Sequence, residues 1–227
     1  MTHIIIGSEE IPCNAKVHTW HEHGLTFDYS HAPTRSELEQ IRWGVLHWTA
    51  SGKRLGLKGA KQVWRTLTRR GLSVEFVITD EGDIWQFVDP KWRRCAHAGR
   101  LNSISLGVEV TGPGWLRRYL GSRKQYTGTV HGWTTKFIDY TPEQHASVAA
   151  LADSLALADV IPKFVATEPY ERLPQSYFET HRGWCGHLHC DRLTKKHPKC
   201  DPGPRPLEVL ERHCRAVVCA SCGQVVP

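Results

Sequence analysis

Short apolar runs separated by polar turns mark the predicted strands of this sequence. Residues 41–48 form a compact apolar run that carries His47 near its end, which is typical of a buried strand delivering a polar side chain at its carboxyl end. Residues 74–79 and 84–88 flank an Asp-Glu-Gly-Asp turn and predict a β-hairpin. Residues 104–110 predict another strand, closed by a Gly-Pro-Gly turn.

Between these runs lie segments whose apolar residues have helical spacing. Residues 58–70 form one such segment, and Gly71 is a good helix stop. Thr141-Pro142-Glu143-Gln144 combines an N-cap, a proline at the first helical position and an amide in the first turn, so it predicts a helix that continues to about residue 158. Residues 207–215 predict a short last helix. Strands alternating with helices indicate an α/β fold, with a central mixed sheet flanked by helices in a single domain.

Two stretches lack either pattern. Residues 1–35 are rich in His, Thr and Pro with only short strand-like pieces, and we expect them to wrap the domain. Residues 115–137 are basic, aromatic and interrupted by Gly, which predicts a long surface insertion.

Composition and charge narrow the class of protein. The chain has 227 residues, 40% of them hydrophobic and 23% charged, as expected for one globular domain. Its net charge of +6 favours anionic partners such as nucleic acid, a membrane surface or cell-wall polymers. Nine Trp, several in polar surroundings, suggest aromatic side chains exposed in a groove. No stretch approaches the roughly 18 apolar residues of a transmembrane helix. The first residues lack the pattern of a signal peptide, so we expect synthesis in the cytoplasm.

Eight cysteines are many for a chain without a signal peptide, and favour reduced thiols or metal ligation over disulfides. Cys214, Cys219 and Cys222 lie in or beside the tail, residues 216–227. Their Cys-x-x-Cys spacing suits a second, structural zinc site, although a tail with free thiols is an equally good interpretation.

Candidate metal ligands gather near the C-terminal end. Gly186-His187 is followed by Lys199-Cys200-Asp201-Pro202-Gly203. Imidazole nitrogen and carboxylate oxygen both bind Zn²⁺ well, and three protein ligands with one open position make a catalytic site. This stretch needs a ligand from another part of the chain, and the strand-end His47 is the candidate.

Six motifs, taken in order, resemble the zinc-dependent N-acetylmuramoyl-L-alanine amidases, the amidase-2 and peptidoglycan-recognition-protein family. Together they span roughly residues 41–206. The motifs are Val45-Leu46-His47-Trp48-Thr49-Ala50, Phe76-Val77-Ile78 with Gly82 and Ile84-Trp85-Gln86, Ala96-His97-Ala98-Gly99, Ser105-Leu106-Gly107-Val108-Glu109, Gly186-His187 and Lys199-Cys200-Asp201-Pro202-Gly203-Pro204.

The resemblance implies the fold of that family and a catalytic domain over residues 36–215. It implies a Zn²⁺ ion held by His47, His187 and Asp201, with an open position for water. It also implies that Glu109 moves protons and that Lys199 stabilises the oxyanion. Trp48 and His97 are the implied substrate contacts.

Three features depart from the pattern or leave alternatives. Some relatives carry a Tyr before the strand at residue 76, where this chain has Val74-Glu75, so Glu75 is an alternative acid. Cys200 is a softer ligand than Asp201, and His189 would replace His187 in a shifted register. The family register favours His187 and Asp201.

The implied function is hydrolysis of the amide between N-acetylmuramic acid and L-alanine in peptidoglycan. We expect a monomeric phage-type endolysin that reaches the wall through a partner such as a holin. A cytosolic muropeptide-recycling amidase and a non-catalytic peptidoglycan-binding module are the alternatives. A nucleic-acid-binding zinc protein, suggested by the charge and the tail cysteines, is the least favoured, and we expect no nucleic-acid partner.

Overall fold

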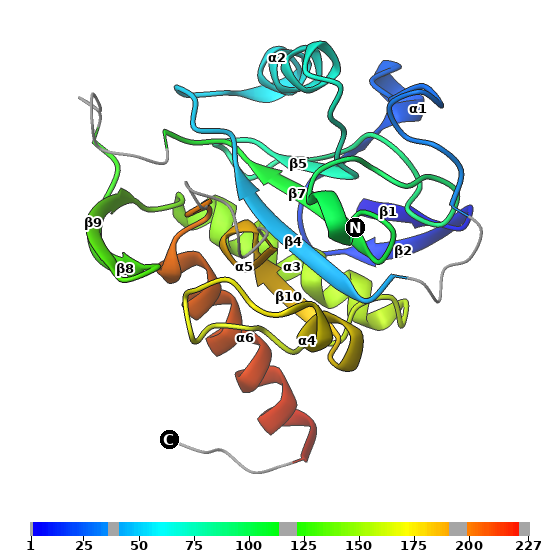
Figure 1. Cartoon of the computed structure of the whole chain (residues 1–227). Coiled ribbons are helices and arrows are strands. Elements are labelled where there is room, and N and C mark those ends of the chain that lie inside the picture. Colours follow the sequence, from blue (N-terminus) through cyan, green and yellow to red (C-terminus); the bar gives the residue numbers. More distant parts are fainter. Residues whose placement is uncertain (1, 36–40, 114–121, 191–198, 223–227) are drawn as a thin grey trace.

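A six-stranded mixed sheet forms the centre of the computed structural model, which describes residues 2–35, 41–113, 122–190 and 199–222 (Figure 1). The strand order is β10-β4-β7-β5-β6-β3, and only the β5–β6 pair is antiparallel. The strands are β3 (Val17–Thr19), β4 (Trp43–Trp48), β5 (Phe76–Ile78), β6 (Ile84–Gln86), β7 (Ser105–Val110) and β10 (Gly183–Gly186). The predicted strands and the β5–β6 hairpin are confirmed.

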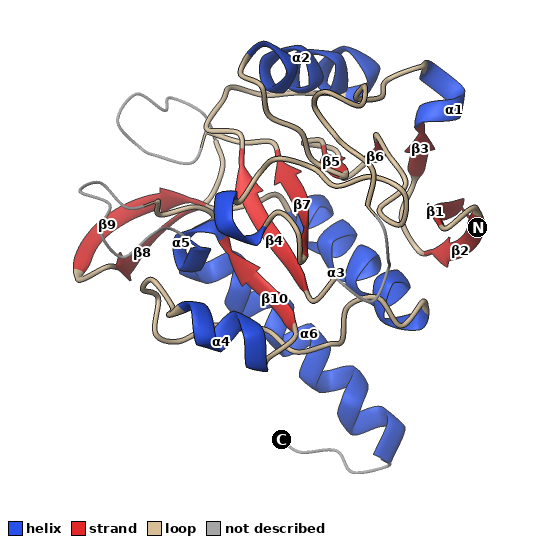
Figure 2. Cartoon of the chain, turned by 45° about the vertical axis from the view of Figure 1, so that its right-hand side comes forward, coloured by secondary structure: helices blue, strands red, loops and turns tan. Residues whose placement is uncertain are grey.

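Helices cover both faces of this sheet, as predicted (Figure 2). On one face, Leu46 and Val108 pack with residues of α3 (Pro142–Leu157) and α6 (Pro204–Cys222) in the largest core cluster. On the other face, Val77 and Trp85 pack against α2 (Gly56–Arg69). A third cluster joins β4 and β10 to α4 (Gln175–Thr180). Successive side chains of a strand point to opposite faces of the sheet, so one strand contributes to the cores on both faces.

The predicted start of α3 at Thr141 is confirmed, and its side chains form a capping box. The Thr141 hydroxyl accepts a hydrogen bond from the Gln144 amide at 3.1 Å, and the Gln144 side chain accepts one from the Thr141 amide at 3.0 Å. This capping box satisfies two amides that the helix itself leaves unpaired.

The N-terminal residues are more regular than predicted. β1 (Thr2–Ile6) and β2 (Glu9–Cys13) form an antiparallel hairpin, and the Ser154 hydroxyl of α3 donates to the carbonyl of Pro12 at 2.7 Å. β3 then joins the central sheet beside β6, and a one-turn helix, α1 (Trp20–His23), follows. This segment therefore supplies the edge strand of the sheet.

The predicted surface insertion contains a second hairpin. β8 (Gln125–Val130) and β9 (Trp133–Ile138) are antiparallel, and Phe137 is buried in the main core. Residues 114–121 lie outside the described residues.

The last helix is longer than predicted. α6 continues to Cys222 because, after Pro206 in its first turn, no glycine or proline occurs before Gly223. Cys214 is buried against the main core, so this thiol packs as an apolar group. The side chains of Cys219 and Cys222 lie outside the described residues. In the described part of the chain, no helix is long and apolar enough to span a bilayer.

Candidate metal centre

Register in the sheet brings two histidines side by side. Gly186 of β10 pairs with Leu46 of the parallel strand β4, so the residues that follow, His187 and His47, lie next to each other. Their Nδ1 atoms are 3.0 Å apart. His187 begins α5 (His187–Cys190).

A loop from the far end of the chain adds a carboxylate to this pair. Asp201 Oδ2 lies 3.2 Å from His187 Nδ1 and 3.5 Å from His47 Nδ1. The Leu188 amide donates to the Asp201 carbonyl at 2.8 Å and fixes the loop on α5. Gly186 permits this approach, because a Cβ there would lie 2.7 Å from Cδ of Pro202.

These atoms fit a divalent metal ion. A tetrahedral zinc with bonds of roughly 2.1 Å separates its ligand atoms by about 3.4 Å, close to the spacings here. Burial and the neighbouring His187 lower the pKa of His47 to about 4, so its imidazole is neutral at pH 7. Burial alone would raise the pKa of Asp201, but His187 and His47 lower it overall and keep the carboxylate ionised. Neutral imidazole and ionised carboxylate are the forms that bind metal.

The two alternative ligands lie outside this cluster. His189 is fully buried, and its Nδ1 accepts a hydrogen bond from the Gly186 amide at 3.2 Å. Cys200 is partly buried against the main core. Neither belongs to the group of His47, His187 and Asp201, whose ligand atoms all lie within 4.8 Å of one another.

Glu109 lies in the same row of the sheet. It pairs with His47 across β4 and β7, so both side chains lie on one face. Burial, together with the charge of Asp201, raises the pKa of Glu109 to about 8. Its Oε2 is shielded from solvent and has no hydrogen-bond partner among the described residues. A carboxyl group in this state is suited to exchanging protons near neutral pH.

A cavity of about 280 Å³ opens over this row. Glu109, Lys199, Trp48 and His97 all line it together with the three candidate ligands, so every predicted site residue lies at one place. Arg70, at the end of α2, also lines the cavity and opposes the rise in the pKa of Glu109. Sequence reasoning missed Arg70, because nothing separates it from other basic residues at helix ends.

His97 contacts a candidate ligand directly, which sequence reasoning also missed. The Ser105 hydroxyl donates to the Leu101 carbonyl at 2.7 Å, so it accepts from His97 Nε2 at 3.2 Å. His97 Nδ1 then accepts from His47 Nε2 at 3.0 Å. This chain of bonds leaves the lone pair of His47 Nδ1 directed at Asp201 and His187. Gly107 makes room, since a Cβ there would lie 2.7 Å from the His97 ring.

We expect His97→Ala to weaken zinc binding by about 10- to 100-fold, because His47 loses the acceptor that fixes its tautomer. His97→Gln, whose side-chain oxygen can accept the same bond, should recover part of the loss. Competition with a chromogenic chelator measures the affinity, and His181→Ala, at an exposed histidine, is the control. Equal affinities of the alanine variant and wild type would contradict this role.

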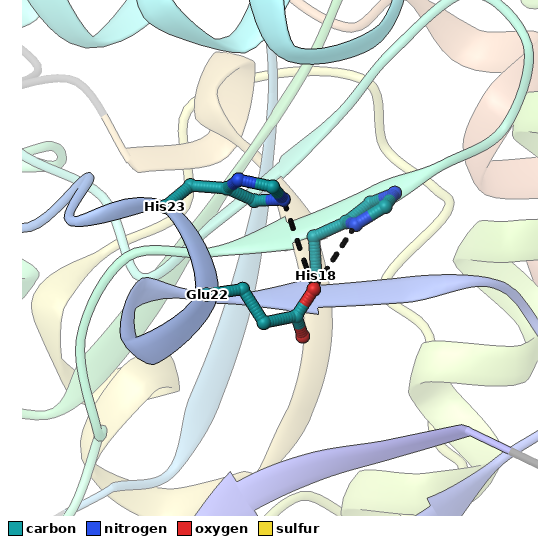
Figure 3. A group of neighbouring side chains, drawn as sticks. All are labelled: His18, Glu22 and His23. Atoms are coloured by element: carbon teal, nitrogen blue, oxygen red, sulfur yellow. Dashed lines mark hydrogen bonds and ion pairs between the residues drawn. The ribbon is translucent and has the colours of Figure 1, made fainter.

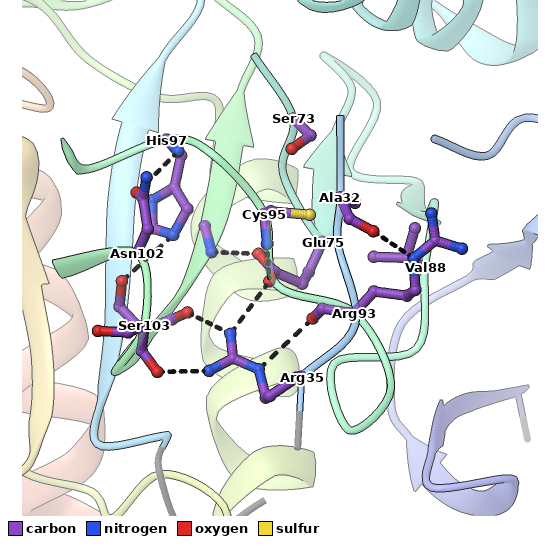
Figure 4. A network of polar contacts seen from close by, with 12 residues as sticks. Ala32, Arg35, Ser73, Glu75, Val88, Arg93, Cys95, His97, Asn102 and Ser103 are labelled. Atoms are coloured by element: carbon purple, nitrogen blue, oxygen red, sulfur yellow. Dashed lines mark hydrogen bonds and ion pairs between the residues drawn. The ribbon is translucent and has the colours of Figure 1, made fainter. Parts of the chain in front are cut away.

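Glu75 does not line the cavity but belongs to a buried polar network behind the His97 loop (Figure 4). It is fully buried, accepts hydrogen bonds from the Gly107 amide at 2.6 Å and the Cys95 amide at 3.3 Å, and lies 3.7 Å from the Arg35 guanidinium. Arg35 also donates to the Ser103 carbonyl at 2.8 Å. Glu75 thus ties the loop that carries His97 to the sheet, and it is not the alternative acid.

Removing this charge should destabilise the fold. Glu75→Gln leaves the buried Arg35 without its counter-ion, which typically costs roughly 3–5 kcal/mol. Urea unfolding measures the change. A variant with wild-type stability would contradict this structural role.

Residues 37–204 match the family model described as N-acetylmuramoyl-L-alanine amidase, Amidase_2. The chain belongs to this family. No curated protein sequence matches this Amidase_2 chain.

Solved structures share its fold. The N-acetylmuramoyl-L-alanine amidase LysC from Clostridium intestinale URNW is 15% identical, with 92% of this chain and 99% of that chain covered and a TM-score of 0.52. Drosophila peptidoglycan recognition protein SD is 16% identical, with coverages of 88% and 95% and a TM-score of 0.52. The complex of peptidoglycan recognition proteins LCa and LCx with tracheal cytotoxin gives 13% identity, coverages of 87% and 95%, and a TM-score of 0.53. These matches confirm the amidase-2 and peptidoglycan-recognition fold.

Proposed function

We propose that this protein is a zinc-dependent amidase that hydrolyses the bond between N-acetylmuramic acid and L-alanine in peptidoglycan. The observation that supports it most is the convergence of His47, His187 and Asp201 beside the buried carboxyl of Glu109. Membership of the Amidase_2 family supports the choice of bond.

A Zn²⁺ ion bound by these three residues would polarise the substrate carbonyl and lower the pKa of a water molecule. Glu109 accepts the proton of the attacking water and passes it to the leaving amine of L-alanine. Lys199, at the wall of the same cavity, stabilises the negative charge that develops on the carbonyl oxygen. Trp48 and His97 line the cavity where the substrate binds.

We further propose that the substrate is the intact cell wall, as for an endolysin that a partner such as a holin releases. The hairpin β8–β9 supports this. Its His131 donates from Nε2 to the carbonyl of the cavity residue Lys199 at 2.8 Å, so the turn lies at the cavity edge. Trp133, the first residue of β9 after this turn, is 77% exposed, and an exposed indole can stack on a sugar ring.

Assays on two substrates, purified sacculi and soluble muropeptides, distinguish this function from its alternatives. We expect the zinc-loaded protein to clear a suspension of purified sacculi and to release new amino ends of L-alanine. Cleavage of soluble muropeptides alone would indicate a recycling amidase. Binding to sacculi with no new amino ends would indicate a non-catalytic module.

Trp133→Ala tests the role of the hairpin. We expect clearing of sacculi to slow by roughly 10-fold, in keeping with the loss of one stacking contact, while cleavage of a soluble muropeptide stays unchanged. Trp92→Ala, which removes another exposed indole, is the matched control. Equal rates of clearing for all three proteins would contradict the proposed contact.

A further inference from the structure

A second group of potential metal ligands lies in the N-terminal segment, apart from the cavity (Figure 3). It consists of His18 at β3 and of Glu22 and His23 in α1. Glu22 Oε2 lies 3.4 Å from His18 Nδ1 and 3.7 Å from His23 Nε2, and the ligand atoms are all within 4.8 Å of one another. These separations are close to the roughly 3.4 Å between ligands of a tetrahedral zinc.

Hydrogen bonds orient two of the three side chains for a ligand. Glu22 Oε1 accepts from the Thr19 amide at 3.1 Å in the capping box of α1, which leaves Oε2 directed at the histidines. His18 Nε2 donates to Asp83 Oδ2 at 3.0 Å, and Asp83 is itself held by Lys16 Nζ at 2.6 Å. In the neutral imidazole, which is the form that binds metal, Nδ1 then carries the lone pair, on the side of Glu22. A carboxylate behind a histidine is the usual support of a metal-bound imidazole.

Packing and burial make the group more ordered than a surface ion pair. The His18 ring stacks on Trp85 with centroids 4.1 Å apart, and its side chain is only 16% exposed. His23 packs on the same indole at 5.1 Å, with its side chain 29% exposed. The Glu22 side chain is 47% exposed, so solvent reaches the group from that side.

The group is independent of the catalytic cavity. His18 pairs with Trp85, Trp85 with Val77, Val77 with Glu109, and Glu109 with His47, so the two sites occupy one row of the sheet. Four strand spacings separate His18 from His47, about 19 Å. Val77 and Trp85 lie between them in the core under α2, and none of the N-terminal group lines the cavity.

We propose that His18, Glu22 and His23 bind a second divalent transition-metal ion. Two imidazoles and one carboxylate suit Zn²⁺, with water completing the coordination. Bound there, the ion joins β3 to α1 and, through Asp83, to the turn before β6. It serves to anchor the N-terminal segment on the sheet, a function separate from hydrolysis.

Zinc stoichiometry tests this site on the full chain. Metal-free protein is titrated with Zn²⁺ against a chromogenic chelator. We expect two equivalents for wild type, one for Glu22→Gln, one for His187→Ala and none for the double variant. Glutamine keeps the capping box of α1, so loss of its metal does not come from an unfolded helix. His21→Ala, in the same helix but outside the group, should keep two equivalents.

The thermal transition gives a second readout. Saturating Zn²⁺ should raise the Tm of His187→Ala, which retains only the N-terminal site, and should leave the Tm of the double variant unchanged. One equivalent for wild type, or two for Glu22→Gln, would overturn the second site. Two equivalents for His187→Ala would instead contradict the catalytic ligand set, so the two proposals fail separately.

Discussion

Asp201→Asn is expected to remove bound zinc from the catalytic centre and amidase activity together. Asparagine has nearly the same shape, but its neutral amide replaces the carboxylate that lies 3.2 Å from His187 and 3.5 Å from His47. We expect at least about a 100-fold loss of zinc affinity at this site and more than about a 1,000-fold loss of kcat/KM, since the proposed zinc would both polarise the carbonyl and activate water.

Cys200→Ala is the matched control for this prediction. Cys200 is adjacent to Asp201 and is the softer ligand, yet it packs against the main core rather than in the ligand cluster. We expect the alanine variant to keep its metal and most of its activity, measured as zinc per chain after gel filtration and as release of amino ends. Loss of zinc in Cys200→Ala, with Asp201→Asn unaffected, would mean that the ligand is the cysteine.

The residues that the sequence suggested for this centre line one cavity, and two different signals pointed to them. His47 lies near the end of a predicted apolar strand, whereas His187 and Asp201 were indicated by the ordered motifs that resemble the amidases. The strand β10 before His187 was not predicted. Glu109 was likewise indicated by the motif resemblance, and the structure makes its strand the other neighbour of β4. The predicted strands and helices follow from their strong apolar periodicity.

Non-local contacts explain what the sequence did not predict. The bond from His97 to His47 depends on how a loop crosses β7, and no local pattern encodes that crossing. β3 finds its partner β6 only 67 residues later in the sequence, where Val17 pairs with Ile84, so residues 1–35 look irregular in isolation. Consequently the grouping of His18 with Glu22 and His23 becomes visible only when α1 is folded against Trp85.

Glu109→Gln should give the second large effect, a fall in kcat of about 100- to 10,000-fold with zinc still bound, as for removal of a general base. Glutamine keeps the shape of the side chain but cannot accept a proton. Zinc content and kcat are measured on the same preparation. A variant that loses zinc as well would show that Glu109 acts on the metal and not on the proton.

The pH dependence of the reaction gives this prediction its sharpest form. Burial and Asp201 raise the pKa of Glu109 to about 8, and a divalent cation beside it would lower that value, because positive charge favours the carboxylate. A base must be ionised to act, so kcat/KM of wild type should rise with pH through the pKa of Glu109 and level off above it. In Glu109→Gln the residual activity should lack this rise, since the group that titrates is gone. If the rise persists unchanged in the variant, the proton acceptor is another group, and Glu109 only shapes the cavity.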